Sequence, residues 1–87
     1  MNYYDSESYK IFSEFKFELD KLLYEENFRS NYIAKQIERG TLYYKYTKRI
    51  LLSLADKDSA LKASQDILLE FTKFAVTLGE RAGEVSD

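Results

Sequence analysis

The sequence predicts an all-α fold, an up-down-up antiparallel three-helix bundle, and three observations lead to it. Apolar residues recur at steps of three and four from about residue 5 to residue 82, which is the period of an amphipathic helix. The chain has no proline and only three glycines, which favours long helices over a turn-rich β fold. Two short polar stretches interrupt the pattern, so three helices with short connections are expected in a single domain, residues 1–87.

The first helix is expected over about residues 5–27. Asp5 and Ser6 are candidate N-caps, and Glu7 lies favourably near the positive end of the helix. At about 100° per residue, six apolar residues fall in one arc and are expected to face the core. They are Ile11, Phe12, Phe15, Leu19, Leu22 and Leu23.

The second helix is expected over about residues 31–55, with Ser30 as its cap. Its most regular stripe has steps of 4, 3, 4, 3, 4 and 3, a heptad seam that predicts the core face. The seam is Ile33, Ile37, Gly40, Tyr44, Thr47, Leu51 and Leu54. Gly40 either lets a neighbouring helix approach closely or ends one helix and gives a fourth. A continuous helix is favoured because the period crosses the glycine without a phase shift.

The third helix is expected over about residues 59–82, after a connection that holds two candidate N-caps. Its apolar arc is wider than about 120°, which suggests packing against two neighbours. The arc comprises Leu61, Ile67, Leu68, Phe71, Phe74, Ala75 and Leu78, with Leu69 and Val76 extending it. Gly79 or Gly83 is expected to end the helix.

The first helix carries a second stripe, in which Phe17, Lys21, Tyr24 and Phe28 follow one another at steps of 4, 3 and 4. Either a widened core or the Tyr3–Tyr4 segment covers these aromatic residues, or they contact a partner protein or a second copy. The partner hypothesis extends the stripe onto the second helix. Its residues are Phe17, Tyr24, Phe28, Leu42 and Tyr46.

Charge is unevenly distributed along the chain. Residues 29–49 carry six bases and one acid, whereas the segments on either side are acidic. One interpretation is complementarity within the bundle, which favours the antiparallel arrangement. The alternative is a basic and aromatic face, opposite the seam, that binds nucleic acid through Lys35, Arg39, Lys45, Tyr46 and Arg49. A net charge of −2 weighs against that alternative.

Catalytic chemistry finds little support in the sequence. The chain has no cysteine and no histidine, so a disulfide scaffold, a thiolate nucleophile, an imidazole base and the usual zinc ligands are excluded. Glu14 with Glu18, and Asp66 with Glu70, are carboxylates four residues apart, and both pairs are expected to point outward into water. There is no glycine-rich phosphate loop. We therefore expect no enzymatic activity, no cofactor and no metal site.

Surplus apolar stripes on a small helical protein typically mark a partner surface. The sequence thus predicts a small non-enzymatic protein–protein interaction module, such as a regulator, inhibitor, adaptor or assembly subunit, that forms a homodimer. The amino-terminal residues lack the pattern of a signal peptide, and no run approaches the roughly 20 apolar residues of a membrane span. We expect a cytoplasmic protein with no membrane contact.

Overall fold

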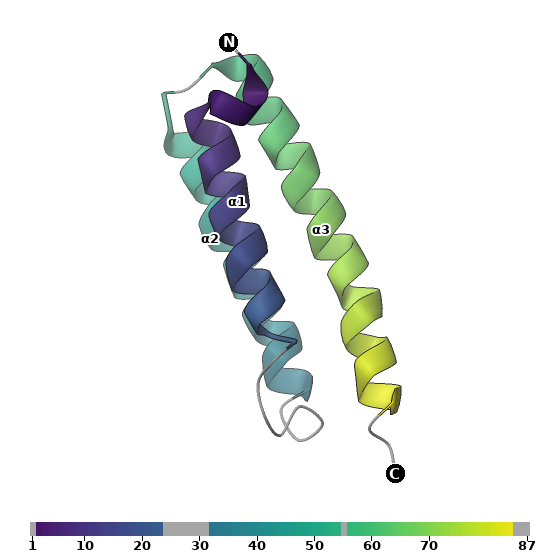
Figure 1. Ribbon diagram of the computed structural model, residues 1–87. Coiled ribbons are helices and arrows are strands. Elements are labelled where there is room, and N and C mark those ends of the chain that lie inside the picture. Colours follow the sequence, from purple (N-terminus) through teal and green to yellow (C-terminus); the bar gives the residue numbers. More distant parts are fainter. Residues whose placement is uncertain (1, 24–31, 55, 85–87) are drawn as a thin grey trace.

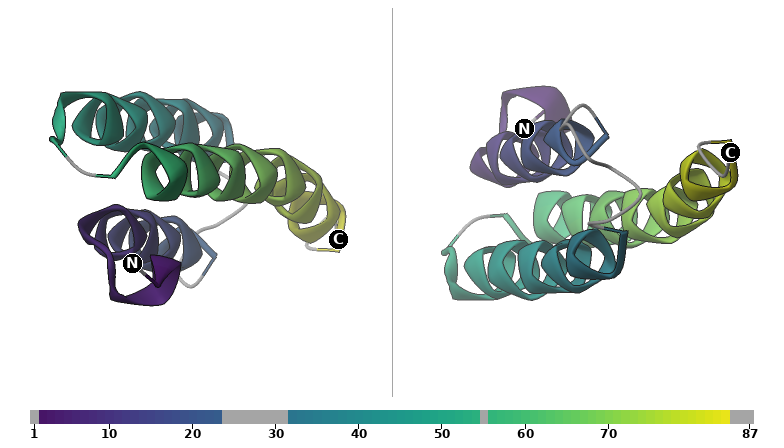
Figure 2. Two further views of the ribbon diagram at one scale, coloured as in Figure 1. Left: turned by 90° about the horizontal axis from the view of Figure 1, so that it is seen from above. Right: turned by 90° about the horizontal axis from the view of Figure 1, so that it is seen from below.

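The computed structural model describes residues 2–23, 32–54 and 56–84, and it confirms the predicted all-α three-helix bundle. The elements are a 3₁₀ turn η1 (Tyr3–Asp5) and the helices α1 (Glu7–Lys21), α2 (Tyr32–Leu52) and α3 (Lys57–Glu84). The described residues contain no strand. Each helix contacts the other two, and the chain direction alternates from one helix to the next (Figure 1). Seen from either end, the helices form a triangle (Figure 2).

Polar side chains cap the described helix starts. Ser6 is the N-cap of α1, and its Oγ accepts a hydrogen bond from the backbone N–H of Tyr9 at 3.1 Å. Asp56 precedes α3, and its carboxylate accepts from the backbone N–H of Ser59 at 3.0 Å. Each cap satisfies a helix N–H group that has no partner inside the helix. Ser6 is thus confirmed as a cap, and α3 begins slightly earlier than predicted.

The glycines do not break the helices. α2 runs through Gly40 without interruption, which confirms the continuous helix and removes the four-helix alternative. α3 passes through Gly79, the first of its two predicted ends, and runs to Glu84, one residue past Gly83, the second. A helical glycine is less favourable than alanine by about 1 kcal/mol, which the packing of a long helix readily offsets. α1 ends at Lys21, and the rest of its predicted range past Leu23 lies outside the described residues.

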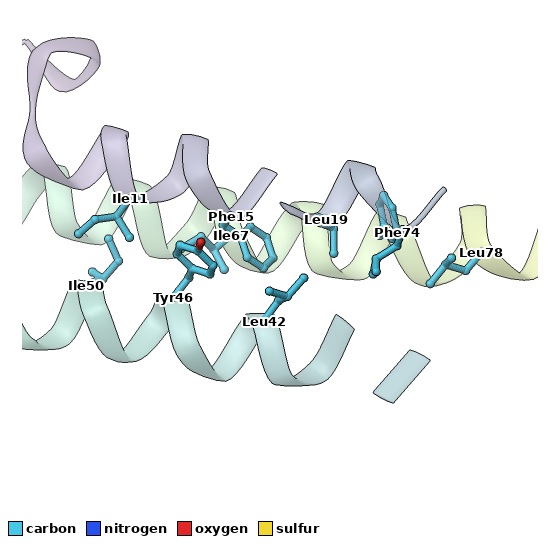
Figure 3. Packing of buried hydrophobic residues seen from close by; sticks show 11 residues of the cluster. Ile11, Phe15, Leu19, Leu42, Tyr46, Ile50, Ile67, Phe74 and Leu78 are labelled. Carbon is cyan, nitrogen blue, oxygen red and sulfur yellow. The ribbon is translucent and has the colours of Figure 1, made fainter. Parts of the chain in front are cut away.

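The core is a ladder of side chains along the axis of the bundle (Figure 3). The buried apolar residues are Ile11, Phe15, Leu19, Leu22, Leu42, Tyr46, Ile50, Ala63, Ile67, Phe74 and Leu78. α1 contributes as predicted: the apolar members of its arc are either buried or packed against the core edge. Phe15 is fully buried and meets the Tyr46 ring edge-on, with 5.8 Å between ring centroids. Such edge-to-face contacts add to the stability gained from burial.

The bundle is long and thin, with extents of 49 × 19 × 17 Å. Its radius of gyration is 14.4 Å, whereas a compact domain of this length has about 12 Å. Its accessible surface of 5877 Å² exceeds the roughly 5,400 Å² expected for this mass. Surface that a rounder domain would bury is therefore exposed on the helices. Among the described helices, none has the length and hydropathy that a membrane crossing requires.

Ion pairs connect the helices, and the pair between α2 and α1 is of the kind that complementarity with a basic middle helix predicts. Arg49 of α2 pairs with Glu14 of α1, and Lys16 of α1 lies 3.7 Å from the carboxylate of Glu70 on α3. These pairs are partly exposed, so each adds little to stability. They do, however, favour one rotation of each helix over another.

Candidate interaction surface

α2 is rotated relative to the sequence prediction. The predicted seam faces solvent: Ile33 is 73% exposed, Tyr44 is 66% exposed and Leu51 is 82% exposed. The buried residues of α2 are Lys35, Leu42, Tyr46 and Ile50. The prediction that the heptad stripe forms the core face of this helix is therefore wrong.

Contacts on the opposite side explain the rotation. Tyr46 meets Phe15 in the core, and Arg49 pairs with Glu14 of α1. The Arg39 guanidinium lies 3.9 Å from the centre of the Phe71 ring of α3 and donates to the Phe71 carbonyl at 2.7 Å. Arginine stems cover apolar surface while their charged ends find acceptors at the rim. The basic and aromatic side of α2 thus fits between α1 and α3, and the purely apolar stripe remains outside.

This rotation buries part of the predicted nucleic-acid face. Lys35 and Tyr46 are buried, while Arg39 and Arg49 are held against α3 and α1. Lys45 remains exposed, with its ammonium 5.3 Å from the centre of the Tyr46 ring. The five residues do share one side of α2, as predicted. Two of the five are buried, which corrects their assignment to a surface, and the other three do not form a face of their own because Arg39 and Arg49 are held by neighbouring helices.

The predicted partner-binding residues divide in a similar way. Leu42 and Tyr46 belong to the core, which corrects their assignment to a surface. Phe17 is exposed on the side of α1 that faces away from the bundle, and the Lys21 ammonium lies 4.8 Å from its ring centre. Tyr24 and Phe28 lie outside the described residues. The aromatic stripe of α1 therefore stays a prediction.

α3 has apolar residues on two opposite sides. Ile67, Phe74 and Leu78 are buried, as predicted. Four other apolar side chains are more than half exposed: Leu61, Leu68, Leu69 and Val76. The wide arc is therefore two stripes, and the assignment of Leu61 and Leu68 to the core is wrong. A helix near the edge of a thin bundle has too few neighbours to cover both stripes.

The exposed stripe of α2 points away from α1. Tyr46 and Arg49 mark the side of α2 that contacts α1. Tyr43 marks the side that contacts α3, since its ring centre lies 4.4 Å from that of Phe71. At about 100° per residue, the stripe through Ile37 and Tyr44 lies almost opposite the α1 contact and roughly 110° from the α3 contact. It thus borders α3 on the far side of the hairpin.

The exposed stripe of α3 lies on the same side. Asp66 and Glu70 mark the side of α3 that contacts α1, through Tyr3 and Lys16 respectively. The Phe71 ring marks the side that contacts α2. By the same period, Leu61 and Leu68 lie roughly 170° from the α1 contact and about 70° beyond the α2 contact. The two stripes are therefore neighbours on the surface opposite α1.

We call this surface the α2–α3 face. Eight apolar side chains, each more than half exposed, define it: Ile33, Ile37, Tyr44, Leu51, Leu61, Leu68, Leu69 and Val76. The positions between them in the two stripes are Gly40, Thr47, Gln65 and Thr72. Charged residues make up 32% of the chain, yet none lies within these stripes. Beside the stripes, the Lys48 ammonium lies 5.8 Å from the centre of the Tyr44 ring. A large apolar surface with so little charge is unusual on a protein that acts alone.

The carboxylates hold the bundle together. Asp66 accepts a hydrogen bond from the Tyr3 hydroxyl at 2.9 Å, and Glu70 lies near Lys16. This pair thus lies against α1 and does not point outward as predicted. Glu14 does face solvent, and the hydrogen bond from Arg49 lowers its pKa. Burial, together with Asp66, raises the pKa of the Tyr3 hydroxyl. The described residues bring together no group of three or more potential metal ligands of the histidine, cysteine or carboxylate type.

Comparison with protein-family models, with curated proteins and with solved structures found no match to this chain.

Proposed function

We propose that this protein is a small non-enzymatic helical module that acts by binding protein through the α2–α3 face. The observation that carries the proposal is the exposure of two adjacent apolar stripes without a charged residue in either. A regulator, an inhibitor, an adaptor and an assembly subunit all work through such a surface.

The size of the face supports a protein partner over a small ligand. Full burial of one large apolar side chain removes roughly 60–120 Å² from water, so eight that are between 51% and 82% exposed present roughly 300–600 Å². One partner in a specific protein complex contributes about 800 Å². A flat surface of this area suits another helix or a helical hairpin.

Nucleic acid is not supported as a second function. The basic residues on which that alternative depends, Arg39 and Arg49 among them, bind neighbouring helices. The stripes of the α2–α3 face themselves contain no basic residue, and Lys48 beside them lies with its ammonium 5.8 Å from the centre of the Tyr44 ring. A single lysine offers little neutralisation of phosphate, which dominates nucleic-acid affinity. A non-enzymatic role is supported by the same chemistry, because the carboxylates of Asp66 and Glu70 serve contacts between helices.

Site-specific photo-cross-linking tests the proposal. A benzophenone amino acid replaces Tyr44 on the face in the full chain, and the same amino acid replaces Lys10, which is exposed on α1, as the control. In the cells that produce the protein, position 44 should form a discrete cross-link to a polypeptide, and position 10 should not. Equal cross-linking at both positions, or no cross-link at position 44, would contradict the proposal.

A further inference from the structure

We propose that the α2–α3 face binds a second copy of this chain in a two-fold contact, with Gly40 where the helix backbones of the two copies come closest. The inference rests on the proposed function and specifies the partner. Docking two such hairpins face to face gives a four-helix core made of α2 and α3 from each copy, with α1 on the outside.

The absence of charge favours a second copy. In a two-fold contact the same patch meets itself, so charges near the axis confront charges of the same sign. The stripes of the α2–α3 face contain no charged residue. Lys48 beside them has its ammonium 5.8 Å from the centre of the Tyr44 ring, but it lies about 12 Å along the helix from Gly40, so the centre of the contact is free of that penalty. A surface selected for a different helical partner typically carries charges that choose it and reject others.

The spacing of the stripes favours helix-on-helix docking. Ile33, Ile37, Gly40, Tyr44, Thr47 and Leu51 follow one another at steps of 4, 3, 4, 3 and 4. This repeat keeps apolar residues facing a partner helix that crosses at about 20°, as in coiled coils and four-helix bundles. Inside the monomer the repeat has no such partner, because this side of α2 is exposed.

Gly40 provides an independent observation. It lies in the middle of α2, where glycine lowers helix stability relative to alanine. Nothing in the monomer requires it, because a Cβ atom added there would meet no heavy atom within 4 Å. A glycine in the centre of an apolar stripe lets the backbone of another helix approach closely. A second copy supplies the helix that the monomer lacks.

Sedimentation equilibrium on the purified full chain tests the inference. The wild-type protein should be a dimer at about 100 μM, and Ile37→Lys with Leu68→Lys should weaken dimerisation by at least about a hundredfold. Both residues are exposed, so the helical circular dichroism signal should be unchanged. Tyr44→Lys alone provides a second variant should the double variant lose structure. Phe17→Lys is the matched control, since it charges an exposed apolar residue on α1, and it should remain a dimer.

Gly40→Ala separates the close approach from general helix stability. The added methyl group should make the isolated chain more stable to denaturation yet weaken the dimer about tenfold, because it prevents the helices from approaching. Thr41→Ala is the control: it raises helix propensity beside the stripe and should leave dimerisation unchanged. Tighter dimerisation of Gly40→Ala would overturn the role assigned to this glycine.

The outcomes distinguish this inference from the proposed function. A monomeric wild-type protein that still cross-links through position 44 to another polypeptide overturns the second copy and supports the proposed function. A monomeric protein without a cross-link overturns both. The protein could instead dissociate with Phe17→Lys and remain a dimer with the lysine variants of the α2–α3 face. That result would overturn the assigned surface and place the contact on the aromatic stripe of α1.

Discussion

α1 and α2 have similar amphipathic patterns and are used in opposite ways. α1 buries its most regular apolar stripe, which contains Phe15 and Leu19. α2 exposes its most regular stripe. Its opposite side carries Leu42, Tyr46 and three basic residues, each of which is buried or partly buried. The difference shows that neighbours decide which side of a helix faces inward. Arg49 of α2 pairs with Glu14 of α1, and the Arg39 guanidinium lies on the Phe71 ring of α3. Long basic side chains can cover apolar surface.

A substitution in the buried stripe of α1 should cause the largest loss of folding stability. Phe15→Ala removes a fully buried ring that packs on Tyr46, and we expect it to lower the free energy of unfolding by about 3–5 kcal/mol. Phe17→Ala on the same helix is the control, because its exposed ring should change stability by no more than about 0.5 kcal/mol. Urea denaturation measures both. Equal losses at the two positions would show that α1 is oriented differently.

Two adjacent residues of α2 sharpen the comparison further. Ile50 is 3% exposed and Leu51 is 82% exposed. Ile50→Ala should therefore lower the free energy of unfolding by about 2–5 kcal/mol, whereas Leu51→Ala should change it by less than about 0.5 kcal/mol. Urea denaturation at low protein concentration, where the chain is monomeric, measures both. A larger loss of stability for Leu51→Ala than for Ile50→Ala would show that the heptad stripe faces the core.

The contact between η1 and α3 should give a smaller effect. Tyr3→Phe removes the hydroxyl that donates to Asp66, with an expected loss of about 0.5–1.5 kcal/mol at neutral pH. The pKa of Tyr3 is raised in the folded state, so its contribution is present below the unfolded pKa and is lost as pH rises. Thermal melts compared with those of Tyr4→Phe, an exposed neighbour, measure the loss. Identical melts for the two variants would contradict the bond.

The ion pair between α1 and α2 should give the smallest effect. Arg49 lowers the pKa of Glu14, so the pair contributes above the unfolded pKa of this carboxyl group and its contribution is lost as pH falls through the folded value. Glu14→Gln should thus reduce stability at pH 7 by less than about 1 kcal/mol and leave it nearly unchanged at pH 3. Melts in high salt should diminish the difference. A larger effect at pH 3 than at pH 7 would contradict the pairing.

The sequence was sufficient to predict the number, order and approximate extent of the helices, because a period of three to four residues and the absence of proline are local properties. It also predicted the buried side of α1, because the six-residue arc through Phe15 and Leu19 outweighs the second stripe, which is interrupted by Lys21. It failed on α2 because the helix has two candidate stripes, and apolar count favoured Ile37 and Tyr44. The contacts that decide the matter, such as Arg39 on Phe71, join residues that are distant in sequence.

The candidate surface was predicted only in part. A surplus of apolar stripes indicated a partner surface, but the residues proposed for it on α2, Leu42 and Tyr46, are core residues. The signal that could have identified the α2–α3 face was the absence of charge along the stripes of Ile37 and Leu68. A core stripe in so thin a bundle tolerates basic residues at its rim, so a stripe without any charge can be the exposed one.

The orientation of α2 is the central claim, and cysteine labelling at two adjacent positions tests it most directly. The chain has no cysteine, so Ile50→Cys and Leu51→Cys each introduce a single thiol. The rate of its reaction with a maleimide reports exposure in protein diluted to the monomer. We predict that the thiol at position 51 reacts as fast as in unfolded protein and that the thiol at position 50 reacts at least about tenfold more slowly. Protection at position 51 together with rapid reaction at position 50 would contradict the account.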